Sequence, residues 1–348
     1  MNLTFNPAQL HAAIIRTLLA GLVPHVEGSP GVGKSDIARA VAKTLNLKVI
    51  DLRLSQCDPT DLMGFPNVQG AKARYVPMET FPIKGDSLPV EMDEKGTITH
   101  TYDGWLLFLD ELPSAPRAVQ AAAYKLILDK MVGQHPLHKC VAIMSAGNKA
   151  TDKAIVNSMS TAIQSRLVHM ELAVSLNDWS QWAAENGIDS RIVGFLNYKP
   201  GLLHKFSPDH QDKTFPCPRT WAFASRLSKD QNVAMVDLPL YAGVVGQGAA
   251  QEFITFAELY QSLPKIEEIV RSPQTVAIAG EISIRYAIAT YVADHIDEKN
   301  AESVVMFLDR LDVEMQVVAY RLAVNRKNGL VANQSIYSRL EKLGSFLN

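Results

Sequence analysis

The chain is poor in cysteine, because its 348 residues include only three, Cys57, Cys140 and Cys217, which lie far apart. None of them belongs to a CxxC pair, so the sequence offers no zinc knuckle. Sparse, unpaired cysteines are typical of a reducing compartment, where thiols stay reduced. The cysteine content therefore excludes a small scaffold held together by disulfides.

Long apolar runs and a strong charge of either sign are also lacking. No stretch approaches the roughly 20 apolar residues that span a bilayer, and the start MNLTFNPAQL has no basic segment followed by an apolar one. The formal net charge is −2, with 47% hydrophobic and 20% charged residues, which does not favour a nucleic-acid coat. We expect a soluble, cytoplasmic protein without a membrane segment.

The hydrophobic pattern changes near residue 175. Before it, short apolar runs alternate with helical spacing, which predicts an α/β domain around a mostly parallel sheet. The elements expected there are strands over residues 24–27, 47–52, 105–112, 140–145 and 168–174, helices over 7–20, 35–45 and 117–129, and a hairpin over 131–138. Residues 57–103 show little periodicity. After residue 175 helical spacing dominates, with long helices expected over 238–260 and 301–325.

A glycine-rich loop follows the first of these strands. It fits the pattern G-x-x-x-x-G-K-[ST] with the residues Gly28, Ser29, Pro30, Gly31, Val32, Gly33, Lys34 and Ser35. Glycines let backbone N–H groups turn inward around phosphate oxygens, and the next helix points its N-terminus at the same anion. In this pattern Lys34 provides a charge for the β- and γ-phosphates and Ser35 a hydroxyl for Mg²⁺. The segment is therefore predicted to bind a nucleotide.

The apolar run over residues 106–109 ends in two acids, Asp110 and Glu111. A fully apolar strand is typical of the centre of a parallel sheet, and it brings the acids to the sheet edge. Asp110 is then placed to hold Mg²⁺ through water, and Glu111 to act as general base on an attacking water. Acids at a strand end are often merely solvated, but downstream of a phosphate loop we favour the catalytic interpretation.

Asn148 ends the next expected strand, VAIMSAGN. An amide at that place is able to orient the lytic water or to touch the γ-phosphate. Gly-Asn is also a common turn pair, and the pattern alone favours the turn.

The segments GSPGVGKS, LLFLDEL, MSAGN, MSTAIQSRL and CPRTW, in that order, resemble the MoxR branch of AAA+ ATPases. The first three look like Walker A, Walker B and sensor 1, and residues 55–66 also look like that branch. The irregular segment before Walker B and the VGQHPLH segment resemble its helix-2 insert and pre-sensor-1 hairpin. The resemblance covers residues 1–230 well and the remainder poorly.

Two arginines also receive a role from the resemblance. It implies that Arg166 is the arginine finger that reaches a neighbour's ATP, and that Arg219 is the sensor 2 arginine. Leu167 departs from the phenylalanine that often follows the finger.

The resemblance also implies the domain organisation and the function. It implies an AAA+ core over residues 1–175, a helical lid over 176–262 and a helical C-terminal extension over 263–348. ATP and Mg²⁺ would bind between core and lid, in a homo-oligomeric ring that is a hexamer in the family. Such proteins act as chaperones that remodel or mature a protein substrate, often with a von Willebrand factor A domain partner.

Two alternative functions stay open. An AAA+ motor or loader would share these motifs, although the near-neutral charge makes nucleic acid an unexpected partner. A nucleotide-dependent switch or scaffold with little turnover would share them too. The presence of Glu111 and Arg166, which are expected to promote hydrolysis, argues against it. Without the resemblance, Arg166 and Arg219 would be taken for surface or salt-bridge residues. His135 and His138 fit a polar hairpin better than a metal site, since no Cys or acidic partner accompanies them.

Overall fold

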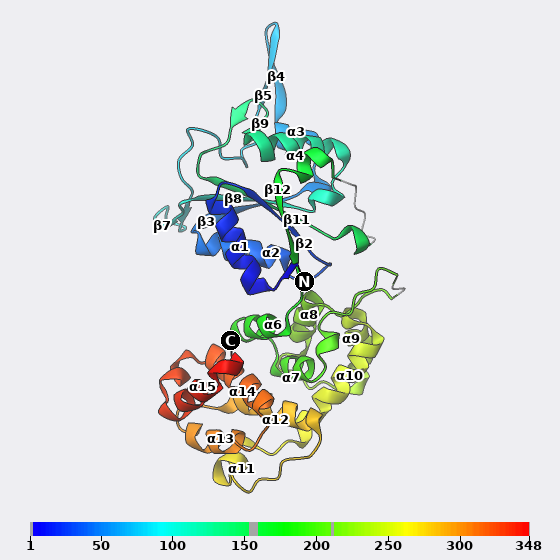
Figure 1. The fold of residues 1–348 in the computed structure, drawn as a ribbon, viewed down its shortest axis with the longest axis vertical. Helices are drawn as coiled ribbons and strands as arrows, with labels where there is room; N and C mark the ends of the chain where they lie inside the picture. The colour runs from blue at the N-terminus through cyan, green and yellow to red at the C-terminus, as the bar shows by residue number, and fades with distance from the viewer. Residues whose placement is uncertain (1–2, 153–158, 210–211, 348) are drawn as a thin grey trace. The chain divides into compact units, whose positions relative to one another are not determined.

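The computed structural model describes residues 3–152, 159–209 and 212–347. The chain forms two compact units, Met1–Ala173 and Val174–Asn348, which are described separately (Figure 1). Within the described ranges, none of the helices combines the length and the apolar character that a bilayer crossing needs.

A six-stranded sheet forms the centre of unit 1, in the order β1-β12-β2-β11-β8-β3 and with every neighbouring pair parallel. Its strands are β1 (Thr4–Phe5), β2 (Val23–Glu27), β3 (Leu47–Arg53), β8 (Gly104–Asp110), β11 (Val141–Gly147) and β12 (Leu167–Leu172). Nearly all residues of β8 are buried, as expected of a central strand covered on both faces. The predicted α/β class with a mostly parallel sheet is confirmed.

Helices cover both faces of this sheet, and each face has its own hydrophobic core. The helices of unit 1 are α1 (Pro7–Leu19), α2 (Lys34–Thr44), α3 (Pro59–Met63), α4 (Arg117–Asp129) and α5 (Thr161–Gln164). Leu106 and Phe108 pack with α1 and α2, whereas Leu107 and Leu109 pack with α4 on the other face. Side chains alternate along β8 in this way because successive residues of a strand point to opposite faces.

The segment over residues 57–103 is more regular than its sequence predicts. It holds α3 and two antiparallel hairpins, made of β4 (Phe65–Gln69) with β5 (Lys72–Val76) and of β6 (Val90–Met92) with β7 (Ile98–Thr101). Nearly every residue of these four strands is exposed, so no buried face imposes the alternation by which strands are recognised. The small hairpin expected over 131–138 is confirmed as β9 (Met131–Val132) and β10 (His135–Pro136).

Unit 2 is helical. Its helices are α6 (Leu176–Glu185), α7 (Ser190–Tyr198), α8 (Pro218–Ser228), α9 (Leu238–Val245), α10 (Gln247–Glu258), α11 (Ile266–Arg271), α12 (Ile282–His295), α13 (Ala301–Leu308), α14 (Val313–Arg326) and α15 (Gln334–Leu347). One hydrophobic core runs from Trp179 to Leu343, so helices on both sides of residue 262 share it. The separation of a lid over 176–262 from an extension over 263–348 stays a prediction.

The lengths predicted for two helices of unit 2 are wrong. The expected helix over 238–260 is broken at Gly246, whose φ of 82° does not continue a helix. The expected helix over 301–325 is broken between α13 and α14 at residues 309–312. The sequence prediction also missed α12, because that helix is apolar around much of its circumference and rich in β-branched residues, which weaken the helical signal.

Candidate functional site

Three neighbouring strands bring the predicted site residues to one edge of the sheet. β11 lies between β2 and β8, and all three run parallel, so their carboxyl ends meet at the same edge. The phosphate loop follows β2, Asp110 ends β8 and Asn148 follows β11. The structure thus brings together three motifs that lie far apart in the sequence.

The phosphate loop has the backbone that its glycines predict. Gly31 and Gly33 have φ values of 77° and 97°, in the left-handed region that residues with a Cβ rarely adopt. α2 begins at Lys34, directly after Gly33, so its first N–H groups have no carbonyl of an earlier helical turn to pair with. Those N–H groups and the positive end of the helix form an anion-binding cradle.

The Lys34 side chain folds back over the loop. Its ammonium group donates to the carbonyl oxygens of Gly28 at 2.6 Å and Ser29 at 3.1 Å, and to Oδ1 of Asn148 at 2.9 Å. Asn148 follows β11, so its hydrogen bond with Lys34 links the end of that strand to the phosphate loop. Asn148 therefore faces the anion cradle, where both of the roles considered for its amide become geometrically possible.

Ser35 and Asp110 supply oxygen atoms beside the cradle. The Ser35 hydroxyl donates to Oδ2 of Asp110 over 3.3 Å. Burial raises the pKa of the Asp110 carboxyl, the nearby Glu111 and Asp51 charges add to the rise, and the Glu111 N–H and Lys34 oppose it. A hydroxyl and a carboxylate are hard oxygen ligands of the kind Mg²⁺ takes, and this ion commonly keeps waters and substrate phosphates as its other ligands. The two residues therefore fit a magnesium ion.

Glu111 lies directly beyond the end of β8 in an unusual backbone conformation. Its φ is 58°, in the left-handed region, which for a residue with a Cβ costs on the order of 1 kcal/mol. Its N–H donates to Oδ1 of Asp110 at 2.9 Å, and Oε2 of its carboxylate accepts a hydrogen bond from the Ser55 hydroxyl. The turn places the Glu111 carboxylate beside the carboxyl end of β3, the neighbour of β8.

Three residues at the site were missed by sequence reasoning. Ser55 follows β3, and only the order β8-β3 reveals that it meets Glu111. Asp152 is buried, and its Oδ1 accepts a hydrogen bond of 3.5 Å from the loop residue Ser29. Its Oδ2 has no hydrogen-bond partner among the described residues. No local pattern marks either residue, because their roles depend on which strands become neighbours.

His25 is the third missed residue, and it lies fully buried on β2, three residues before the loop. Its Nδ1 is 2.9 Å from the Ser145 hydroxyl on β11, and its ring meets that of His169 on β12 edge to face at 5.5 Å. Burial lowers the pKa of His25 to about 3, with smaller contributions from the His169 and Lys34 charges. The ring therefore stays neutral and links the three strands beneath the loop.

Arg166, one of the two predicted arginines, does not join this cluster in unit 1. Arg166 lies two residues after the end of α5 and is exposed. Its Nη1 donates to the Ala162 carbonyl at 2.7 Å, and its guanidinium lies 5.2 Å from the centre of the Tyr124 ring. Arg219 is an exposed residue near the start of α8 in unit 2, and it makes no hydrogen bond or ion pair within the described ranges. Arg166 is therefore not engaged with the phosphate loop of its own chain in the way that Lys34 is.

Comparison with known proteins agrees with this geometry. Residues 25–167 match the AAA domain of the dynein-related subfamily, a region that includes the phosphate loop, Asp110, Glu111, Asn148 and Arg166. Among curated proteins, none matches the chain.

Three solved structures are similar at low identity. A proposed ATPase from Cytophaga hutchinsonii is 15% identical with a TM-score of 0.33, over 99% of this chain and 91% of that one. Two variants of RuvB from Thermotoga maritima are 14% and 13% identical with TM-scores of 0.39, over 77% of this chain and 75% and 76% of theirs. These likenesses are too weak to bear on the function, which rests on the site and on the match of residues 25–167. That segment matches the AAA domain of the dynein-related subfamily, and the chain is an ATPase.

Proposed function

We propose that the chain is a Mg²⁺-dependent ATPase of the MoxR type that works in the cytoplasm as a ring, a hexamer, and remodels or matures other proteins. The observation that carries the catalytic part is the convergence of Lys34, Asp110, Glu111 and Asn148 on one sheet edge beside an anion cradle. A von Willebrand factor A domain protein is the partner that the MoxR resemblance favours.

Each group at the sheet edge has a distinct task in this proposal. Lys34 and the loop N–H groups bind the β- and γ-phosphates, while Ser35 and Asp110 would hold Mg²⁺. The ion would neutralise charge that develops on the phosphate oxygens. Glu111 takes a proton from the attacking water, and the Asn148 amide, which already bonds Lys34, orients that water or the γ-phosphate.

The ring part of the proposal rests on Arg166. Its guanidinium is exposed and held by the Ala162 carbonyl and the Tyr124 ring, away from the contacts that Lys34 makes in the same chain. An arginine held in this way is able to serve a neighbouring subunit, where it would stabilise charge on the transferring phosphoryl group. Arg219 would act as the sensor arginine from unit 2. A ring is then needed to complete each site.

Nucleotide-dependent assembly tests the ring. Because each ATP would bridge two subunits, binding and association are linked by mass action. Light scattering should therefore report larger particles with a slowly hydrolysed ATP analogue than without nucleotide. Arg166→Ala should bind ATP normally in calorimetric titration yet lose most of its hydrolysis. A protein that stays monomeric at high concentration while hydrolysing ATP at full rate would contradict the proposal.

A further inference from the structure

The hairpin of β4 and β5 stands out from the rest of unit 1 (Figure 1). Every residue of both strands is exposed, with Val68 at 72% and Phe65 at 55% of full exposure. Within the described ranges, no third strand joins the pair. A two-stranded sheet buries little apolar surface by itself and is only marginally stable in water, so this hairpin offers an uncovered surface.

The strand register sorts the side chains of this hairpin onto two different faces. Cross-strand partners in an antiparallel pair point to the same face, and successive pairs point to opposite faces. The pairs on one face are Phe65 with Val76, Asn67 with Arg74, and Gln69 with Lys72. The pairs on the other face are Pro66 with Tyr75 and Val68 with Ala73. The first face is therefore polar, and it is basic toward the tip, so we call it the basic face. The second face is apolar apart from the Tyr75 hydroxyl.

The basic face carries charge of one sign only. No aspartate or glutamate occurs over residues 64–78, while Lys72 and Arg74 both lie there. Neither cation forms an ion pair or a side-chain hydrogen bond with any residue in the described part of the chain. Two amides, Asn67 and Gln69, stand opposite the two cations in the register. This face offers hydrogen-bond donors and positive charge, and it lacks a carboxylate to neutralise them.

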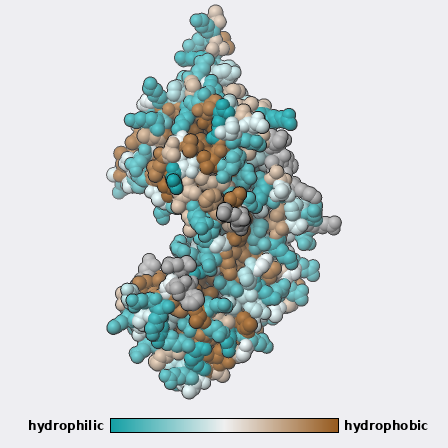
Figure 2. All heavy atoms as spheres, viewed as in Figure 1, coloured by the Kyte–Doolittle hydropathy of each residue, from teal (hydrophilic) through white to brown (hydrophobic). Residues whose placement is uncertain are grey.

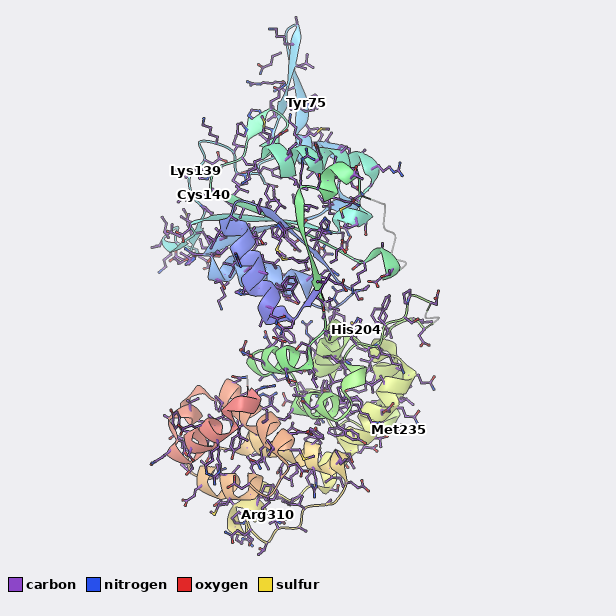
Figure 3. The ribbon with its side chains drawn as sticks, in the orientation of Figure 1. Tyr75, Lys139, Cys140, His204, Met235 and Arg310 are labelled. Atoms are coloured by element: carbon purple, nitrogen blue, oxygen red, sulfur yellow. The ribbon has the colours of Figure 1, made fainter. Side chains whose placement is uncertain are left out.

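The base of the hairpin is fixed although its tip is free. Gly64 has a φ of 88°, and a Cβ there would come 2.2 Å from the Val76 carbonyl oxygen. Gly133, between β9 and β10, is packed as tightly, since a Cβ there would meet the Met63 oxygen at 2.5 Å. The His135 ring nitrogen Nε2 lies 3.0 Å from the carbonyl oxygen of Tyr75, which Figure 3 labels near the hairpin's base. A fixed base holds the exposed tip ready for a ligand, which lowers the entropy lost on binding.

We propose that the β4–β5 hairpin docks an extended segment of a partner protein in which acidic and apolar side chains alternate. A strand that adds to a sheet edge places alternate side chains on the two faces. Its carboxylates would then meet Lys72 and Arg74, and its apolar side chains would cover Val68 and Tyr75. Figure 2 shows the hairpin as a narrow projection that carries both hydrophilic and pale brown, more apolar residues.

Docking at this hairpin is also connected to the ATPase site. Ser55 contacts Glu111, and the chain runs from Ser55 through α3 directly into Gly64 and β4. The expected consequence is that the docked segment changes the rate of ATP hydrolysis. This proposal rests on the proposed remodelling function, because the occupant is a segment of a protein substrate or partner.

Fluorescence anisotropy with a labelled peptide of alternating Glu and Val tests the docking directly, without nucleotide. The full chain should bind this peptide, and Lys72→Glu with Arg74→Glu should weaken the affinity about tenfold or more. The matched control is Lys84→Glu with Lys95→Glu, which reverses two exposed cations outside the hairpin and should leave binding unchanged. A thermal unfolding curve for each variant checks that the fold is kept.

Three outcomes would overturn the docking proposal. The first is equal binding of an alternating Lys-Val peptide, and the second is tighter binding of single-stranded oligothymidine than of the acidic peptide. The third is a hairpin variant that changes the oligomeric state in light scattering, since the surface would then belong to a second copy of the chain. Peptide binding without any change in ATP hydrolysis would leave docking intact and count against the remodelling function.

Discussion

Replacing Ser55 by alanine removes the hydroxyl that donates to the Glu111 carboxylate, and we expect this change to speed ATP hydrolysis. A hydroxyl that donates to a carboxylate occupies a lone pair of the accepting oxygen and stabilises the resting arrangement. The bond also holds Oε2, which in the proposed mechanism must be available to accept the proton of the attacking water. We therefore expect Ser55 to be a positioning residue that restrains Glu111, the proposed general base.

The size of this effect follows from the type of bond. A hydrogen bond to a charged group contributes about 1.5 kcal/mol or more. If half to all of about 1.5 kcal/mol is recovered in the transition state, turnover rises about three- to tenfold. The backbone strain at Glu111, whose φ is 58°, is unchanged by the substitution and does not enter this difference.

Phosphate release under saturating ATP is the assay. Ser55→Thr keeps a hydroxyl at the same position and should stay near the wild-type rate. Ser114→Ala removes a hydroxyl that is near Glu111 in the chain but makes no side-chain hydrogen bond within the described ranges, so it controls for loss of a serine. Ser55→Ala with unchanged ATP affinity and an unchanged or slower rate would refute the restraining role.

Three further predictions concern Lys34, Glu111 and His25. Lys34→Ala should lose most of its ATP affinity in calorimetric titration, because the phosphates lose their main side-chain charge; wild-type affinity in the folded variant would reject the phosphate loop. Glu111→Gln should bind ATP but hydrolyse it about 10²–10⁴ times more slowly, and full turnover would mean that another residue is the base. The pKa of His25 is about 3 in the folded chain against its ordinary value of 6.5, so the neutral ring contributes its full share to the free energy of unfolding above pH 6.5. Below pH 6.5 the free energy of unfolding should fall by about 1.4 kcal/mol per pH unit until pH 3, and chemical denaturation of His25→Gln should show a flatter profile.

The parts of the site that lie within one short segment are predictable from sequence. The loop from Gly28 to Ser35 has a fixed spacing of glycines, lysine and serine. Asp110 and Glu111 end a continuous apolar run of the kind that is typical of a central strand. Ser55 and Asp152 are not predictable in this way, because their partners come from segments that only the fold brings near.

The same limit applies to the fold. The buried strands β8 and β11 are visible in the sequence because burial on both faces demands continuous apolar residues. The exposed hairpins over 57–103 have no buried face and hence no pattern. Gly246 breaks a helix whose flanking residues continue the helical spacing, so periodicity alone joins α9 to α10.

A mixing experiment with Arg166→Ala and Lys34→Ala tests the proposed ring most directly. Each variant should be inactive alone, the first because its ring lacks fingers and the second because it cannot bind ATP. In a mixed ring, a Lys34→Ala subunit provides an intact Arg166 to a neighbour with an intact phosphate loop. We predict that ATP hydrolysis returns on mixing. No recovery at any ratio, with mixed rings confirmed by native mass spectrometry, would contradict a site completed by the neighbouring subunit.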